Sequence, residues 1–170
     1  ELRRVGDVPA GWQPRVVCLA RAVLYGWHVA RAYGVAARGH AAHCRVNGRV
    51  WPVRGRIISN FGPREGGLHN DGINIAAPNG VPIVAADNGV VAYAGQELRV
   101  FGNLLLIKHA DGWTSAYAHA QRILVKRGDR VKRGQAIGTI GTTGSVTRPQ
   151  LHFELRRGSR AVDPRGELET

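Results

Sequence analysis

From Arg49 onward, the chain consists of short apolar runs that turn residues separate at close spacing. The runs are rich in Val, Ile, Leu and Tyr, which fit the pleated surface of a β-sheet, while Gly, Asn and Asp stand between them. No convincing helical pattern lies between these runs. Such a succession indicates an all-β fold, an antiparallel β-sandwich or open barrel.

Turn residues divide this part of the chain into strand-length pieces. They lie at Asn88-Gly89, Asp111-Gly112, Gly128-Asp129, Gly134 and Gly158, and Asp163-Pro164 closes the series. Asn-Gly and Asp-Gly accept the positive φ angles of tight hairpin turns, so the first two sites predict hairpins. A last hairpin is predicted to turn near Gly158.

Residues 1–48 differ from the rest of the chain. They are rich in Ala and Arg and have no Lys, and some apolar residues fall on one helical face. Glycines interrupt that face, and each weakens a helix by up to ~1 kcal/mol relative to Ala. We therefore expect a weakly structured extension or linker in residues 1–48, partly helical at most, and a β domain in residues 49–170. Whether Cys18 and Cys44 of the extension pair or stay free is left open.

The charge of the chain narrows the choice of partners. Lys and Arg outnumber Asp and Glu by 24 to 12, which gives a formal net charge of +12. This surplus favours anionic partners such as nucleic acid, acidic lipid or a cell-wall polymer. The basic residues are dispersed and no helix-turn-helix, zinc-finger or RNP-type motif occurs, so nucleic acid is not expected. No apolar stretch approaches the ~20 residues that span a bilayer, so no transmembrane segment is expected.

Five segments of the β part closely resemble the LytM or lysostaphin-type zinc metallopeptidase domain. They are GRIISNFGPR (55–64), GINIAAPNGVPIVAADNGVVAYAG (72–95), FGNLLLIKHADGWTSAYAH (101–119), VKRGDRVKRGQAIGTIGTTG (125–144) and LHFELR (151–156). The resemblance implies an antiparallel β fold with a groove across a sheet. Active members are zinc endopeptidases that cut peptide cross-bridges in bacterial peptidoglycan. A degenerate branch, the NlpD-type murein hydrolase activators, keeps the fold and switches on separate cell-wall amidases.

The zinc-binding positions of this family hold different residues here. Active relatives use a motif that resembles H-x-G-x-D, and a distant H-x-H supplies a general base and then a third ligand. Aligned on Gly72, the first two ligand positions hold Asn70 and Asn74, Gln150 replaces the base, and His152 remains. Amide oxygen is a poor zinc ligand, and Gln cannot take up a proton near neutral pH.

The resemblance also places His119, in the sequence AYAHA, at the position of a histidine that stabilises the transition state. We expect the remnants His119 and His152 to be non-catalytic, and we expect no zinc or other cofactor. Because side chains alternate along a strand, Ile73 and Ile75 should face the core while the asparagines face the groove. The predicted partner-binding groove residues are Asn70, Asn74, His119, Gln150 and His152.

A shifted metal site is an alternative. His69 and Asp71 share a face by alternation, and a bulge would be needed to turn them toward His152. The chain would then be an active zinc endopeptidase that cleaves peptidoglycan cross-bridges. A carrier module is a further alternative, since residues 128–138 resemble the turn region of lipoyl-type domains. It has little support, because no lysine stands at a suitable hairpin tip.

The sequence therefore predicts a non-catalytic LytM-type domain that regulates peptidoglycan hydrolysis in cell-wall remodelling and division. The expected partner is a cell-wall amidase or another peptidoglycan hydrolase, and peptidoglycan itself is a further candidate. The resemblance implies a location in the bacterial envelope, in the periplasm. Glu154 alternates with Phe153 and Leu155, so it should face with His152 and orient its ring.

Overall fold

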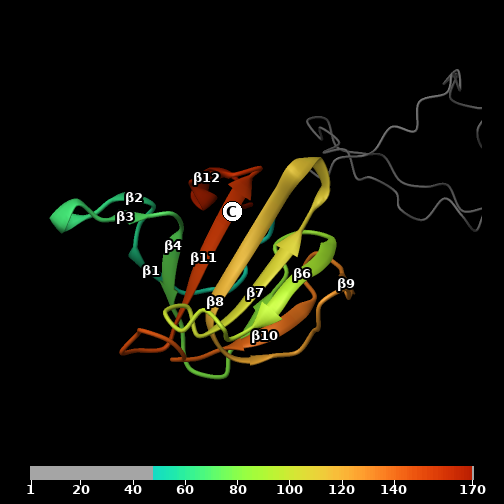
Figure 1. Ribbon diagram of the computed structural model, residues 1–170, viewed down its shortest axis with the longest axis horizontal. Coiled ribbons are helices and arrows are strands. Elements are labelled where there is room, and N and C mark those ends of the chain that lie inside the picture. The colour runs from blue at the N-terminus through green and yellow to red at the C-terminus, as the bar shows by residue number, and fades with distance from the viewer. Residues whose placement is uncertain (1–47, 170) are drawn as a thin grey trace, which may run out of the picture. The chain divides into compact units, whose positions relative to one another are not determined.

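Seven strands pair in the order β1-β4-β11-β8-β7-β6-β9 and form the main sheet of the computed structural model (Figure 1). Their bounds are Arg56–Ser59 (β1), Ile73–Ala76 (β4), Gly89–Gly95 (β6), Asn103–Lys108 (β7), Trp113–Ile123 (β8), Arg130–Val131 (β9) and Gln150–Arg157 (β11). The structure describes residues 48–169. The predicted extension 1–48 lies outside them except for Gly48, as do Cys18 and Cys44.

The remaining strands are shorter. β5 (Pro82–Val84) pairs with β10 (Ala136–Ile140), which also pairs with β8, while β12 (Arg160–Val162) pairs with β11. β2 (Gly62–Pro63) and β3 (His69–Asn70) form a separate two-stranded ribbon. Every pairing between these strands is antiparallel. The helical segments of residues 48–169 are the short 3₁₀ turns η1 (Glu65–Gly67), η2 (Ala110–Gly112) and η3 (Pro164–Gly166). The predicted all-β antiparallel fold is confirmed. Within the described residues, no helix has the length and apolar character needed to cross a membrane.

One face of the main sheet carries the core. Ile73 and Ile75 of β4 are fully buried there, as are the alternate apolar residues Leu151, Phe153 and Leu155 of β11. They share one apolar cluster with residues of β5 and β10, which cover this face. The alternation leaves the side chains at even positions of both strands on the opposite face. We call that opposite side of β4, β11, β8, β7 and β6 the outer face.

Two of the three predicted hairpins are confirmed and one is wrong. The β7–β8 hairpin turns at Asp111 and Gly112, whose φ angles are 55° and 73°, and Gly158 turns the β11–β12 hairpin with φ of 60°. The hairpin predicted at Asn88-Gly89 is wrong, because β5 pairs with β10 while β6 pairs with β7 and β9. Gly89 meets a different requirement: a Cβ there would lie 2.5 Å from the Lys108 carbonyl oxygen.

Gly72 lies just before β4, at a close approach to β11. A Cβ at this position would lie 2.2 Å from the Phe153 carbonyl oxygen. We expect Gly72→Ala to lower the free energy of unfolding by about 1–3 kcal/mol, because the backbones must separate to admit a methyl group. Urea denaturation measures this loss. Gly166→Ala is the matched control, because a Cβ at Gly166 meets nothing within 4 Å; equal stability of the two variants would contradict the expectation.

Candidate functional site

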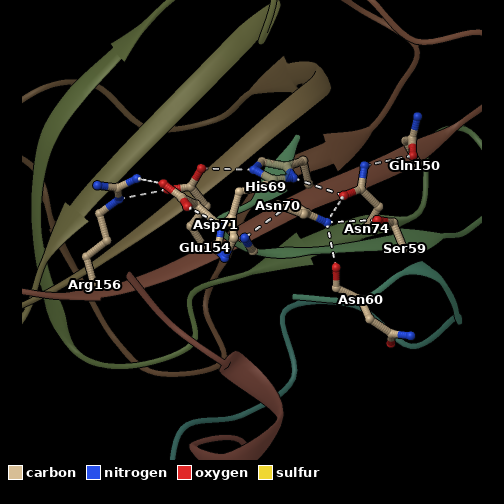
Figure 2. Close-up of polar contacts among 11 residues, drawn as sticks. Ser59, Asn60, His69, Asn70, Asp71, Asn74, Gln150, Glu154 and Arg156 are labelled. Atoms are coloured by element: carbon tan, nitrogen blue, oxygen red, sulfur yellow. Dashed lines mark hydrogen bonds and ion pairs between the residues drawn. The ribbon is translucent and has the colours of Figure 1, made fainter. Parts of the chain in front are cut away.

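The pairing of β4 with β11 joins three of the predicted groove residues. Asn74 stands directly opposite His152, and Gln150 lies two residues earlier on β11. Asn74 Nδ2 donates to Gln150 Oε1 at 3.2 Å, and Asn74 Oδ1 lies 3.1 Å from His152 Nδ1. Figure 2 shows Asn74 between Gln150 and Asn70. We call Asn70, Asn74, Gln150, His152 and Glu154 the polar cluster.

Asn70 is held in one orientation by two backbone groups. Its Oδ1 accepts from the Gly72 N–H at 3.3 Å, and its Nδ2 donates to the Asn60 carbonyl at 3.0 Å. Nδ2 also donates to Ser59 Oγ at 2.8 Å and to Asn74 Oδ1 at 3.2 Å. Because a backbone N–H and a backbone carbonyl contact opposite ends of this amide, its oxygen and nitrogen are assigned. Asn74 therefore directs its own oxygen toward Asn70.

The same oxygen of Asn74 determines how His152 is bonded. His152 Nδ1 faces Asn74 Oδ1, and His152 Nε2 lies 3.0 Å from Glu154 Oε1. Both ring nitrogens of His152 therefore already have a hydrogen-bonding neighbour within the polar cluster. The contact from Glu154 is the one expected from strand alternation. Glu154 also accepts from Arg156 Nε at 2.8 Å.

Charged contacts continue from Glu154 to the molecular surface. Arg156 Nη2 donates to Asp71 Oδ2 at 2.7 Å, and Asp71 Oδ1 lies 2.9 Å from His69 Nδ1. Burial by itself would raise the pKa of the Glu154 carboxyl, but hydrogen bonds from His152 and Arg156 outweigh burial and lower this pKa. The hydrogen bond to Glu154 raises the pKa of Arg156. Glu154 is therefore a buried anion whose two oxygens contact His152 and Arg156.

His119 lies beside the polar cluster, with its ring centroid 6.3 Å from that of His152. Its φ is 65°, an uncommon value for a non-glycine residue, and the pairing register of β8 shifts near this position. Its backbone N–H donates to the Phe101 carbonyl at 2.9 Å, and its Nδ1 lies 2.9 Å from the Thr143 carbonyl oxygen. Burial lowers the pKa of His119, although the Thr143 carbonyl opposes this shift. A neutral ring that donates from Nδ1 fits these contacts.

The predicted groove residues are largely buried. The exposed fractions of Asn70, His119, Gln150 and His152 are 5–8%. A molecule docked on the outer face would therefore gain more area from the residues around them. Among these, Tyr93, Phe101 and Leu106 are half-buried apolar residues that pack on the buried Leu104, Ala116 and Ala118.

The loop before β7 borders this apolar surface. The Phe101 ring centroid lies 6.0 Å from that of His152, and Leu98 and Val100 of the same loop are 53% and 63% exposed. The Val100 carbonyl accepts from the Ser145 N–H at 3.0 Å, which joins this loop to the one between β10 and β11. The loop thus presents two apolar side chains to solvent beside the polar cluster.

Comparison with known proteins places this arrangement in a family. Residues 68–164 match the model of Peptidase family M23. The chain belongs to this family. It is 54% identical over 114 residues to the cell division protein DipM of Caulobacter vibrioides, covering 67% of this chain and 19% of DipM. It is 49% identical over 114 residues to the murein hydrolase activator NlpD of Salmonella dublin, covering 67% of this chain and 29% of NlpD.

Solved M23 structures show the same fold. A mutant catalytic domain of the prophage-encoded M23 protein EnpA from Enterococcus faecalis matches with a TM-score of 0.63 and 35% sequence identity, over 70% of this chain and 95% of that domain. The resemblance read from the sequence is thereby confirmed. The chain spans only 19–29% of the length of DipM and NlpD.

The polar cluster does not fit the zinc ion that the M23 family implies. Asn70 and Asn74 offer amides in place of imidazole and carboxylate, and both nitrogens of His152 face acceptors. Within residues 48–169, no group of three or more His, Cys, Asp and Glu side chains is arranged to hold a metal. Catalytic zinc takes three strong protein donors. Here His152 and Glu154 contact each other, and they also contact Asn74 and Arg156, so the cluster does not present three such donors to one ion.

The shifted site of His69, Asp71 and His152 is not assembled either. His69 is half exposed and packs edge-on against Phe61, with ring centroids 5.5 Å apart. One Asp71 oxygen contacts His69, and the other lies 2.7 Å from the Arg156 guanidinium, whose charge would repel a metal cation. His152 bonds instead to Asn74 and Glu154.

Sequence reasoning missed three residues that shape this M23 site. Arg156 contacts both Glu154 and Asp71, Phe101 flanks His152, and the Thr143 carbonyl holds His119. Arg156 follows Glu154 by two residues on β11, so strand alternation was a signal for their contact. Thr143 contacts His119 through its backbone carbonyl, so the residue type at position 143 does not predict this contact.

Proposed function

We propose that this M23 domain is non-catalytic and regulates peptidoglycan hydrolysis by activating a separate hydrolase, a cell-wall amidase. The observation that carries this proposal is that the zinc-ligand positions hold amides whose hydrogen bonds satisfy one another and His152. A site without a metal or a free general base lacks the means to activate water. The similarity to proteins named murein hydrolase activator and cell division protein supports the regulatory role.

The proposed docking surface for the hydrolase is the outer face. The exposed side chains of Leu98 and Val100 offer contact area that the polar cluster lacks, and half-buried apolar residues of this face add to it. The polar cluster contributes a floor that its hydrogen bonds keep in one arrangement, which lowers the entropy cost of docking. The predicted groove residues therefore shape the surface more than they contact the partner. They are Asn70, Asn74, Gln150 and His152 of the polar cluster and the neighbouring His119.

The proposal includes a location in the bacterial envelope, in the periplasm, and a domain that works without zinc or another cofactor. The relatives' names place murein hydrolase activation and cell division among their roles. The net charge of +12 suits work beside an anionic cell wall. Peptidoglycan is a further candidate for contact with this surface.

A reconstituted murein-release assay tests the proposal. Dye-labelled peptidoglycan is incubated with a purified cell-wall amidase, with this chain, or with both. We expect the chain alone to release no dye, with or without added zinc, and the mixture to release more than the amidase alone. Chelator-sensitive release by the chain alone would instead establish a zinc endopeptidase. Failure to stimulate any amidase of the same organism would contradict the proposed role.

Val100→Asp tests the docking surface. A charge placed in a desolvated apolar contact is costly, so we expect about tenfold or greater loss of amidase stimulation at subsaturating concentration. Leu124→Asp is the matched control, because Leu124 is 58% exposed and is not part of the outer-face apolar cluster. Equal loss of stimulation in both variants would show that the effect is not specific to the outer face.

A further inference from the structure

A cavity of about 610 Å³ lies apart from the polar cluster. Its lining comes from the β2–β3 ribbon, the start of β8, the β11–β12 hairpin and the segment around η3. Its lining includes Phe61, Trp113, Arg157, Arg160, Asp163 and Glu167. None of the five polar-cluster residues lines this cavity. Its volume is within the range of about 300–1,000 Å³ that small-ligand sites occupy.

The carboxylates of this cavity are already neutralised by arginines outside its lining. Asp163 Oδ2 lies 2.7 Å from Arg165 Nη2, and Glu167 Oε2 lies 3.2 Å from Arg49 Nη1. The Arg165 guanidinium lowers the pKa of Asp163, which keeps this carboxylate charged and paired. The negative charge of the lining is therefore not free to pair with the cavity's own arginines.

The two arginines that line the cavity stand opposite each other on neighbouring strands. Arg157 and Arg160 are a directly opposed pair in the β11–β12 hairpin, and both line the cavity. Among residues 48–169, no carboxylate forms an ion pair with either of them. Like charges directly opposite across two strands destabilise a hairpin. An anion between them would remove this repulsion, so the pair points to a negatively charged ligand.

Two aromatic side chains also line the cavity, so a ligand that fills it needs an apolar part. Trp113 and Phe61 line the same cavity, and the Arg157 guanidinium lies 5.8 Å from the Trp113 ring centroid. The Arg49 guanidinium lies 4.0 Å from the same ring centroid, and this contact helps to hold the indole in place. A ligand for this site therefore combines an anionic group with an apolar one.

We propose that this cavity binds the C-terminal carboxylate of a short peptide, with the carboxylate between Arg157 and Arg160 and the last side chain against Trp113. Guanidinium groups present parallel N–H donors that match the two oxygens of a carboxylate. The cavity volume suits a chain end of a few residues rather than a folded surface. This site is separate from the outer face and does not depend on the proposed hydrolase activation.

Calorimetric titration of the 170-residue chain tests the site. The probes are N-acetyl-Ala-Ala-Leu with a free carboxylate and the same peptide as its C-terminal amide. We expect the acid to bind and the amide to bind at least about tenfold more weakly, because charge-assisted hydrogen bonds are lost. Equal binding of acid and amide would overturn the proposal, and so would no binding of the acid. Inorganic phosphate that binds as tightly as the acid would reduce the site to a general oxyanion site and also overturn it.

Arg160→Gln separates recognition from structural support. We expect this variant to bind the acid about 10- to 100-fold more weakly while its ligand-free unfolding midpoint rises, since the like-charge pair is gone. Arg122→Gln removes an equal charge from an exposed residue of β8 and should keep the wild-type affinity. A fall in both affinity and unfolding midpoint for Arg160→Gln would show a structural role and overturn the proposal. Amidase stimulation by Arg160→Gln should stay at the wild-type level, so the two proposals fail separately.

Discussion

Glu154→Gln is expected to lower the free energy of unfolding by about 3 kcal/mol at about pH 7, the lower end of the cost of breaking a buried ion pair. The Glu154 side chain is 11% exposed and contacts both His152 and Arg156. Gln keeps the shape but removes the charge, so Arg156 loses its buried anion and His152 loses a carboxylate neighbour. The cost stays at the lower end because the Arg156 side chain is 36% exposed and also contacts Asp71. Urea denaturation of the purified chain measures the change.

The pH dependence of this loss identifies its cause. The pKa of Glu154 is lowered in the folded chain, so its contribution is fully present above the carboxyl's ordinary value of about 4.5. That contribution is lost as the pH falls through the folded-state pKa. The stability difference between wild type and Glu154→Gln should therefore narrow as the pH falls below about 4.5. A difference that stays constant into acid would show that packing, and not charge, causes the loss.

Glu65→Gln is the control for the removal of one negative charge. Glu65 is exposed in η1 and makes no ion pair among residues 48–169. Surface changes of this kind alter the free energy of unfolding by about 0.5 kcal/mol or less. A loss of similar size in both variants would assign the effect to net charge and contradict the role of the buried pair.

Strand alternation made the faces of β4 and β11 predictable from sequence. Ile73 and Ile75 are buried in the core, while Asn74 lies opposite His152 on the outer face. The period of two residues is a local property, so an apolar residue on one side determines where its neighbours point. The same rule gave the contact of Glu154 with His152.

Non-local pairings were not predictable in this way. Asn88-Gly89 has the local signature of a hairpin, yet β5 pairs with β10, about fifty residues further along the chain. The ion pair of Arg156 with Asp71 joins residues separated by 85 positions. Such contacts depend on which strands meet in the folded sheet, which neither a turn dipeptide nor alternation encodes. The burial of the polar cluster has the same origin, because it depends on neighbouring strands and loops.

The variant Asn70→His/Asn74→Asp/Gln150→His is expected to bind one zinc ion per chain, whereas the wild type is expected to carry none in stoichiometric amount. The substitutions restore an imidazole and a carboxylate beside His152, and a basic side chain at position 150. Metal analysis of purified, dialysed protein measures zinc content directly. A rise in thermal stability on addition of zinc gives a second measurement, because a ligand that binds the folded state stabilises it.

The spacing of the polar cluster supports this expectation. Asn70 Nδ2 and His152 Nδ1 lie 3.2 Å and 3.1 Å from Asn74 Oδ1. Ligands of a tetrahedral zinc with bonds of about 2.0–2.1 Å are about 3.3 Å apart. A His Nδ1 is as many bonds from Cα as an Asn Nδ2, and an Asp Oδ1 matches an Asn Oδ1, so the new donors reach the same places. The separations that allow hydrogen bonds in this chain would suit a metal with stronger donors.

Asn74→Asp alone is the control that isolates the donor requirement. The aspartate would accept from His152 and Asn70 as Asn74 does, and only one imidazole would stand beside it, so we expect no stoichiometric zinc. In the triple variant, Glu154 can keep its bond to His152 Nε2 while Nδ1 turns its lone pair toward the metal, an arrangement common around zinc. Stoichiometric zinc in the wild type, or its absence from a triple variant that unfolds cooperatively in urea, would contradict this account. Either result would show that the identity of the side chains at positions 70 and 74 does not decide metal binding.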